Sequence, residues 1–498
     1  MSQRLRRLSN WRPLAAMETT TVQQIAPNER LGRPRHLLWI WFSMNVMPLT
    51  LVTGVVGPTV FHLSLAWSCI AIVVGNLIGG LFMALHAAQG PQLAIPQMIQ
   101  TRSQFGSYGA LLVVALVVVE GVGFASSIFV VGGQTLHALA PKVSVDVGVV
   151  ILAVLATTLL LFGYELFHRF NRAIVALMML GVVLGYVWIF AVKGLPTSHV
   201  AGLGFTGAGF LGMLSVSAVW QIAYAPYVSD YSRYMSPDHK ASTTFWTTYG
   251  GSVIGSVVTM ILGSVAGWAS ADPNSVGVIE NLSGAVGPFL LVVLFIGAID
   301  SAMVNCYTPM LSSVTIGQTL RHRWMPKAGS RAVLCLTIVV VSSLLAILGQ
   351  TGFLTNYTNF LNILLYALAP WTAINLVDFY LLRGGKYDIA SILRGDGGVY
   401  GRVAWTGVTC YVIGFLIQIP FMNIYPIYGW SGYVSPVASA LGGADISWLV
   451  GIGLTAPLYL FVERQRFTRP QHSSASVAPL QPVSRPAEVA PEDLFPSR

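Results

Sequence analysis

Long apolar runs recur along the chain between His36 and Val462. Each is about 20 residues long, which is enough for a helix to cross the ~30 Å hydrocarbon core of a bilayer. The runs do not alternate between apolar and polar positions as the strands of a membrane barrel do, so they predict helices. Read in order, they predict about twelve spans, at about residues 36–62, 64–88, 105–134, 147–165, 172–194, 206–228, 244–268, 286–314, 331–349, 355–382, 403–421 and 446–462.

Composition agrees with an all-α integral membrane protein. The 498 residues are 54% hydrophobic and only 9% charged, whereas a soluble domain carries roughly 25% charged residues. The apolar runs fall within a single membrane domain over 35–466. The flanking segments 1–34 and 467–498 are polar and rich in Pro, Ser and Arg or Ala, which predicts disordered tails.

The basic residues predict the orientation of the spans. If the N-terminus is cytoplasmic, only Lys142 and Lys193 of the 27 Lys and Arg residues fall on the outer side. Positive residues concentrate on the cytoplasmic side of membrane proteins. We therefore expect both termini in the cytoplasm and a multi-pass protein in the plasma membrane. The net charge of +9 follows from this topology, and no nucleic-acid partner is expected.

The chain lacks the signatures of an enzyme. It has no phosphate loop, nucleotide fingerprint, HExxH motif or nucleophile elbow. Its four cysteines are scattered inside the spans and fit small buried side chains better than metal ligands or disulfides; they are Cys69, Cys306, Cys335 and Cys410. We expect no catalytic residue, no cofactor and no ATP hydrolysis.

Two acidic residues lie near the centres of apolar runs. An ionised carboxylate in the hydrocarbon region is costly, so Glu120 and Asp300 are expected to face the bundle interior or a wet cavity. Glu120 shares a helix face with Phe124, four residues on, and Asp300 is followed by Ser301 and, five residues later, by Asn305. Such acids are typical of proteins that move polar solutes or ions, although a structural hydrogen bond remains an alternative for each.

Two spans contain helix-breaking residues. The first carries Asn45 and Pro48, and the sixth carries several glycines, a polar-aromatic stretch around Trp220 and Gln221, and then Pro226. Transporters often bind substrate near the membrane centre, between half-helices at equivalent positions of two repeats. The first and sixth spans are five apart, and the same offset relates the spans of Glu120 and Asp300.

Several stretches resemble the nucleobase:cation symporter-1 family, and specifically its purine–cytosine permease branch. They are GPQLAIPQMIQTRSQFGSYG (90–109), GVGFASSIFVVGGQ (121–134), YVSDYSRYMSPD (227–238), NCYTPMLS (305–312) and APWTAINLVDFYLLRGGKYD (369–388). The resemblance implies a LeuT-like five-plus-five inverted repeat, in which spans one and six are broken and spans eleven and twelve are peripheral. It makes 35–466 a transporter domain.

The resemblance also implies a binding site. It places a flat substrate between Phe124 and Trp220, with Gln221 next to Trp220 and the amide of Asn305 reading the edge of the substrate. Asn45, in the break of the first span, and the acid Glu120 are further candidate substrate contacts. Stacking of this kind contributes about 1–3 kcal/mol per aromatic partner. Phe124 stands where the family usually has tryptophan, and Ile128 stands where a polar residue is common. Both departures point away from the usual cytosine or purine substrate and towards a different or less polar ring.

The coupling ion is left open by these residues. The resemblance places a cation where spans one and eight meet, and Asp300 and Ser301 fall there. A carboxylate at this point can bind sodium or carry a proton. The expected function is cation-coupled symport of a nucleobase or related heterocycle (cytosine, purine, hydantoin or a vitamin-like ring) into the cell. The alternatives are an amino-acid transporter of the same fold and an integral membrane enzyme.

Overall fold

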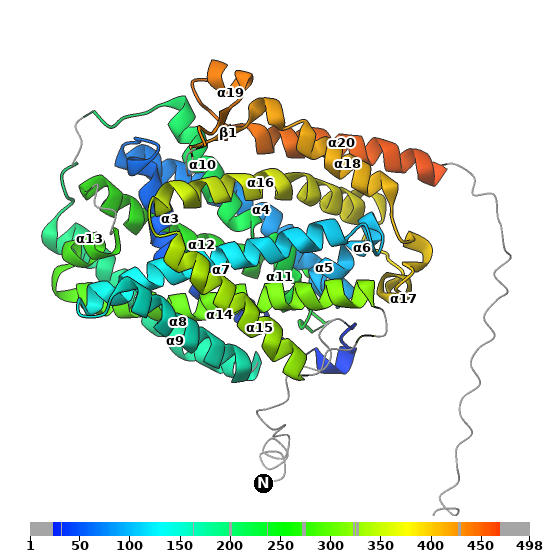
Figure 1. Cartoon of the computed structure of the whole chain (residues 1–498), viewed down its shortest axis with the longest axis horizontal. Coiled ribbons are helices and arrows are strands. Elements are labelled where there is room, and N and C mark those ends of the chain that lie inside the picture. The colour runs from blue at the N-terminus through cyan, green and yellow to red at the C-terminus, as the bar shows by residue number, and fades with distance from the viewer. Residues whose placement is uncertain are drawn as a thin grey trace, which may run out of the picture.

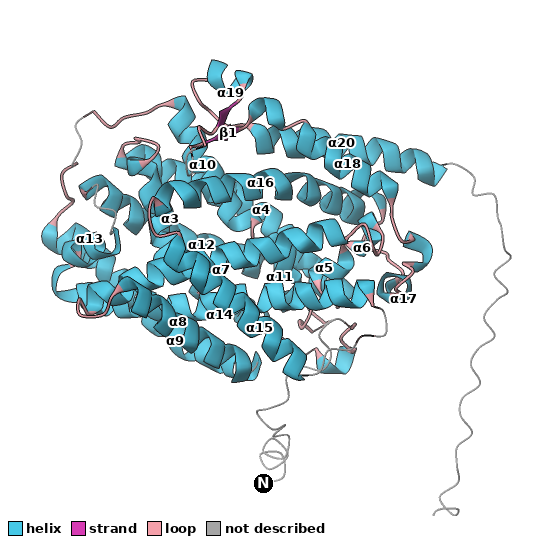
Figure 2. Cartoon of the chain, viewed as in Figure 1, coloured by secondary structure: helices cyan, strands magenta, loops and turns pink. Residues whose placement is uncertain are grey.

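The apolar runs form helices, as a computed structural model of the chain shows (Figures 1 and 2). The structure describes residues 23–30, 32–162, 164–198, 202–236, 238–270, 275–321, 324, 328–426 and 430–468. Most of the two predicted tails therefore lies outside the described residues. The helices of the first half are α2 Pro34–Ser43, α3 Pro48–Thr59, α4 Leu65–Leu93, α5 Gln97–Gln100, α6 Arg102–Phe105, α7 Leu111–Leu139, α8 Val145–Phe162 and α9 Tyr164–Tyr186, which continues into the π-helix Val187–Lys193.

The second half contains most of the remaining helices and one small hairpin. The helices are α10 Gly207–Ile222, α11 Ala225–Ser232, α12 Ala241–Ala269, α13 Ser275–Leu282, α14 Gly287–Leu320, α15 Ala328–Leu348, α16 Phe353–Leu376 with the π-helix Val377–Leu382, α17 Ile389–Leu393, α18 Trp405–Leu416, α19 Pro436–Ala440 and α20 Ser447–Thr468. Strands β1 Asn423–Ile424 and β2 Tyr433–Val434 pair antiparallel. Short 3-10 turns cover Pro27–Glu29, Gly284–Val286, Gly398–Tyr400 and Ile419–Phe421.

Each of the twelve predicted spans coincides with a helix or a helix pair. Among the described residues, eight helices are long and apolar enough to cross a membrane, and the bent pair α2 and α3 brings the number to nine. The apolar parts of α8 and α18 are shorter, and α20 carries charged residues in its last turns. Helix length and composition alone therefore support nine spans, fewer than the twelve predicted.

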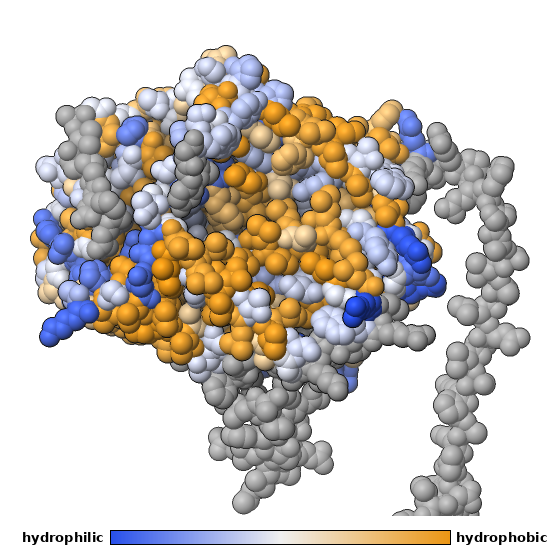
Figure 3. All heavy atoms as spheres, in the orientation of Figure 1, coloured by the Kyte–Doolittle hydropathy of each residue, from blue (hydrophilic) through white to orange (hydrophobic). Residues whose placement is uncertain are grey.

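The surface has the polarity of a membrane protein. In Figure 3, hydrophobic residues fill the middle of the visible face, and the most hydrophilic residues gather towards its two ends. The long helices run along the direction that joins these ends (Figure 1). This is the arrangement expected when the apolar band contacts lipid and the two ends contact water.

The predicted helix breaks differ in shape. Helices α2 and α3 are bent by 58° across Met44–Met47, and α3 restarts with Pro48 at its first position, where a missing N–H costs nothing. In span six the helix is interrupted at Ala223 and Tyr224, just before Pro226, yet α10 and α11 still count as one span. The large bend therefore belongs to span one.

Glycines let the central helices approach closely. A Cβ on Gly297 of α14 would lie 2.0 Å from the carbonyl oxygen of Val46, in the break of span one. A Cβ on Gly121 of α7 would lie 2.6 Å from Cδ of Pro309 on α14. These two contacts bring α14 against both the break and α7. Together, these three segments carry six of the eight predicted site residues.

The end of the N-terminal tail packs on the helices, unlike the disordered segment predicted over 1–34. Ile25 is buried, and its backbone N–H donates to the carbonyl oxygen of Ala94 at 2.9 Å. Arg30 donates to the carbonyl oxygen of Pro91 at 2.8 Å, near the C-terminus of α4. The last carbonyls of a helix lack partners within it. Ile25 and Arg30 supply donors to these carbonyls. This is a tertiary contact, so the polar composition of the tail does not predict it.

Candidate substrate site

The two aromatic residues predicted to enclose a substrate meet at the centre of the bundle. Phe124 of α7 and Trp220 of α10 are both buried, with ring centroids 6.0 Å apart and planes at 90°. Phe360 of α16 packs on Phe124 in a similar edge-to-face contact at 5.2 Å. The structure therefore brings the predicted pair together, but with perpendicular rings rather than two parallel faces.

Asn45, in the break of span one, holds Trp220 in place. Its Oδ1 accepts hydrogen bonds from Nε1 of Trp220 at 2.7 Å, from the hydroxyl of Tyr224 at 3.1 Å and from Oγ of Ser256 at 2.7 Å. Its Nδ2 donates to the carbonyl oxygen of Trp41 at 2.6 Å. An unwound stretch of helix thus becomes the point where α2, α10 and α12 are joined.

Gln221 belongs to the same network. Its Oε1 accepts from Oγ of Ser252 at 2.6 Å, and its Nε2 donates to Oδ1 of Asn76 at 2.8 Å and to Oγ of Ser256 at 2.9 Å. Sequence reasoning missed Asn76, Ser252 and Ser256. The spacing of the two serines, four residues apart on one face of α12, was the available signal.

Asp300 lies beside the break in span one, and Ser301 follows it on α14. Both are fully buried on α14, and Oγ of Ser43, the last residue of α2, donates to Oδ2 of Asp300 at 3.4 Å. Asn305 lies one turn further along α14, and its Nδ2 donates to the carbonyl oxygen of Ser301 at 2.9 Å. No cluster of three His, Cys, Asp or Glu side chains that would suit a metal occurs in the described part of the chain.

Glu120 is buried on α7. It is 1% exposed, and neither carboxylate oxygen has a partner among the described residues. It lies one turn before Phe124, on the α7 turn that packs against Asn305 and Pro309 of α14. A buried polar group left unpaired is rare in native proteins and calls for an explanation.

Comparison with known families identifies the chain. The profile of the family described as "Permease for cytosine/purines, uracil, thiamine, allantoin" matches residues 24–451. The protein belongs to this permease family. It is therefore a multi-pass membrane transport protein and not an enzyme, in agreement with the sequence analysis.

Individual relatives agree with the assignment. The permease is 36% identical to a Bacillus subtilis (strain 168) protein named as a proposed purine–cytosine permease, over 91% of this chain and 97% of the relative. It is 24% identical to the purine–cytosine permease of Emericella nidulans, over 84% of this chain and 83% of the relative. These matches confirm the resemblance noted in the sequence.

A solved structure confirms the fold. The chain superposes on Mhp1, a nucleobase-cation-symport-1 family transporter in a closed conformation with bromovinylhydantoin bound, with a TM-score of 0.70. The match covers 91% of this chain and 96% of Mhp1 at 16% sequence identity. The permease therefore has the LeuT-like fold predicted from the sequence.

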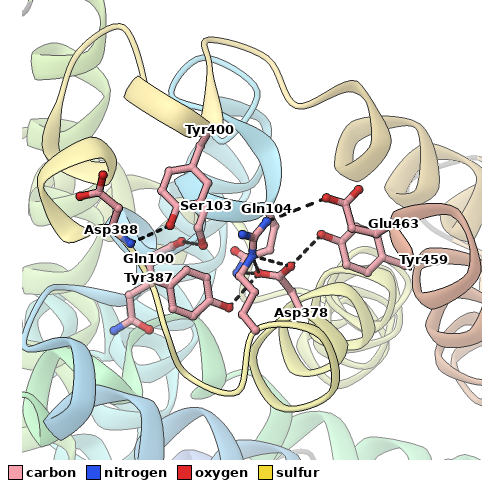
Figure 4. Close-up of polar contacts among 10 residues, drawn as sticks. Gln100, Ser103, Gln104, Asp378, Tyr387, Asp388, Tyr400, Tyr459 and Glu463 are labelled. Atoms are coloured by element: carbon pink, nitrogen blue, oxygen red, sulfur yellow. Dashed lines mark hydrogen bonds and ion pairs between the residues drawn. The ribbon is translucent and has the colours of Figure 1, made fainter. Parts of the chain in front are cut away.

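The stretch 369–388 contributes a buried carboxylate at the end of α16. Asp378, from the stretch 369–388, is fully buried and accepts from Nε2 of Gln104 at 2.9 Å, from Nε of Arg383 at 3.0 Å and from the hydroxyls of Tyr387 and Tyr459 at 2.8 and 3.2 Å (Figure 4). Burial and the Asp378 carboxylate raise the pKa of Tyr387, so its phenol stays protonated and donates.

Further contacts join the same motifs. Gln89 donates to Asn375 at 2.8 Å, and the backbone N–H of Gln97 donates to Asp230 of the stretch 227–238 at 2.8 Å. The stretches 90–109, 227–238 and 369–388 thus hold α4, α11 and the end of α16 together. The other two stretches, 121–134 and 305–312, contain Phe124 and Asn305 of the site itself.

A contact near the other end of α16 also escaped sequence reasoning. The hydroxyls of Thr53 on α3 and Tyr357 on α16 are hydrogen-bonded at 2.9 Å, and both side chains are buried. Beside them, a pocket of about 330 Å³ is lined by residues of α7 and α16 and by the end of α15, including Ser126, Phe353 and Phe360. Helix α16 thus contacts Phe124 through Phe360 and is hydrogen-bonded to α3 of span one through Tyr357.

Proposed function

We propose that this permease is a secondary active transporter that carries a nucleobase or related small heterocycle into the cell by cation-coupled symport. The observation that carries the proposal is the buried contact between Phe124 and Trp220, on packed helices of a purine–cytosine permease fold. Aromatic side chains that part to admit a flat ring give stacking faces on both sides of it.

The polar residues take different roles in this proposal. Phe124 and Trp220 stack on the substrate, and Asn305 reads its edge through the side-chain amide. Asn45 and Gln221 are already hydrogen-bonded within the protein, so we assign them to holding Trp220 and α10 in position rather than to contacting substrate. The proposed set of substrate contacts is therefore smaller than the set expected from the sequence, which included Asn45 and Gln221.

Asp300 and Ser301 are proposed to couple transport to the cation. Asp300 lies at the junction of α2 and α14, where movement of span one changes its surroundings. Its charge must be compensated during each cycle, because crossing a low-dielectric region uncompensated is too costly. We favour a proton over sodium, because hydroxyls and carbonyls suffice to bind sodium without a formal acid.

We propose a plasma-membrane location with both termini in the cytoplasm. The distribution of Lys and Arg supports this orientation. This orientation puts Asp378 and its partners, together with Ile25 and Arg30, on the cytoplasmic side. Thr53 and Tyr357 then lie on the outer side.

Uptake by the full-length protein in proteoliposomes tests the proposal. A panel of labelled nucleobases, hydantoins and vitamin-like heterocycles is offered under a proton gradient, a sodium gradient and neither. Accumulation of at least one heterocycle above its outside concentration is expected only with a gradient. Accumulation of none of them, by a protein that is folded and inserted, would refute the proposed function.

A further inference from the structure

Helix α16 contains a proline that leaves one of its backbone carbonyls without a helical partner. Pro370 has no N–H, so the carbonyl oxygen of Tyr366, four residues earlier, loses the hydrogen bond that an α-helix would give it. Nε2 of the fully buried Gln418 donates to this oxygen at 2.9 Å. Gln418 follows α18, which lies beside α16 (Figure 1). A residue of span eleven therefore completes the backbone hydrogen bonding of α16 at its proline.

The side chain of Tyr366 is held by the connection between spans eleven and twelve. Its hydroxyl is hydrogen-bonded to Oδ2 of Asp445 and lies 3.3 Å from the carbonyl oxygen of Asn423. The same carboxylate accepts from the backbone N–H of Asn423 and, through Oδ1, from that of Ser447 at the start of α20, both at 2.9 Å. Asp445 thus joins the α16 tyrosine to β1 and to span twelve.

Two further contacts join spans eleven and twelve to the helices around the site. Asn359 of α16 exchanges hydrogen bonds with the backbone of Tyr425: its Nδ2 donates to the carbonyl oxygen at 3.0 Å, and its Oδ1 accepts from the N–H at 2.8 Å. Nε1 of Trp448 on α20 donates to Oγ of Ser215 on α10 at 2.8 Å, and both side chains are buried. The two spans therefore bind both α16 and the helix that carries the site tryptophan.

The part of α16 that these contacts hold covers the aromatic pair. Phe360, next to Asn359, packs edge-on against Phe124, and Tyr357, one turn earlier, is hydrogen-bonded to Thr53 of α3. Phe124 and Thr53 are both buried, so this end of the bundle is closed. A substrate that enters here requires α16 to move away from α3 and α7.

We propose that Gln418 and Asp445 are positioning residues that clamp α16 beside Pro370, and that their hold on Tyr366 must loosen before a substrate enters from the outer side. A helix interrupted by a proline bends most easily there, so the outer part of α16 (353–366) can swing once these side chains release it. The clamp gives spans eleven and twelve a role in transport, although they carry none of the predicted site residues. The inference rests on the proposed function for the direction of entry, but the movement is measured without a substrate.

Thr53→Cys reports the movement, because position 53 is buried against Tyr357 in the closed bundle. The full-length protein in lipid nanodiscs is treated with a water-soluble maleimide, which reaches both faces of the membrane, and labelling at position 53 is followed by peptide mass spectrometry. Adding Tyr366→Phe removes the hydroxyl that binds Asp445 but keeps the ring. We expect labelling at position 53 to become about tenfold faster, because loss of a hydrogen bond to a carboxylate favours the open state by roughly that factor.

A second variant and two controls separate the clamp from general loosening. Gln418→Met withdraws the donor from the freed carbonyl of Tyr366 and should also speed labelling. Tyr433→Phe is the matched control, because its hydroxyl donates to the carbonyl oxygen of Ile419 rather than to α16, and it should change nothing. The fully buried native Cys306 should label no faster in any variant.

Two results would overturn the inference. One is unchanged labelling at position 53 in folded Tyr366→Phe and Gln418→Met proteins, and the other is an equal rise at Cys306. Either result would leave heterocycle uptake by the unaltered protein, and hence the proposed function, intact.

Discussion

Trp220 donates its indole N–H to Oδ1 of Asn45 at 2.7 Å, so the central aromatic ring of span six is held by the break in span one. Because a half-helix of span one can move only if this bond moves or breaks, the position of the ring depends on the conformation of the break. The same bond explains why a tryptophan, rather than any large aromatic residue, occupies this position.

Trp220 is predicted to be essential for high-affinity uptake. Trp220→Ala should abolish it, because the stacking face is lost, whereas Trp220→Phe should retain a measurable fraction because a ring remains. Concentration-dependent uptake in proteoliposomes measures both. Unchanged affinity of Trp220→Ala would show that the side chain only fills space between α7 and α10. Phe124→Trp is a companion test, and we expect it to shift the substrate profile rather than weaken all substrates equally.

Asn305 is predicted to discriminate between substrates. Asn305→Ala leaves polar atoms of the ligand unpaired in a buried site, at a cost of about 1–3 kcal/mol, or roughly tenfold to a hundredfold in affinity. Inhibition constants for a series of heterocycles give the measurement, with surface expression as the control. Equal losses for every compound together with poor expression would mark Asn305 as a residue that only stabilises α14.

Asp300 is predicted to link transport to the ion gradient. Asp300→Asn keeps an oxygen that can accept from Ser43 but removes the charge, so substrate exchange should persist while concentrative uptake is lost. Exchange and gradient-driven accumulation are measured in the same proteoliposomes, with the exposed Asp146→Asn as control. Full accumulation by Asp300→Asn would remove Asp300 from the coupling mechanism. Sodium-dependent uptake that resists a proton uncoupler would contradict our preference for protons.

Gly297 is predicted to be irreplaceable at the crossing of α14 with span one. Gly297→Ala places a Cβ 2.0 Å from the backbone oxygen of Val46, and a backbone atom cannot move aside as a flexible side chain can. Lower thermal stability and loss of transport are expected. Gly250→Ala is the matched control, because a Cβ there meets nothing within 4 Å and alanine favours helix by about 0.5–1 kcal/mol. If Gly297→Ala matches Gly250→Ala in thermal stability and transport, α14 and span one can move apart at this crossing without loss.

The sequence by itself determined the class of protein, the helical spans and the break in span one. Apolar runs of this length become helices in a bilayer because each backbone group must find its partner within its own segment. Pro48 sets the restart of α3 for an equally local reason. The family motifs could be read directly from the chain as well, since a motif is a run of neighbouring residues.

Only the tertiary structure decided what the polar residues of those spans do. Asn45 and Gln221 read as substrate contacts in the sequence, but Ser252 and Ser256, on another helix, complete their hydrogen bonds. Glu120 and Asp300 look alike as acids in apolar runs. Yet Asp300 accepts a hydrogen bond from Ser43, whereas Glu120 has no hydrogen-bond partner in the part of the chain that the structure describes. The reason is physical: a buried polar group takes its role from the partners that packing places within about 3 Å, and residues distant in sequence supply those partners.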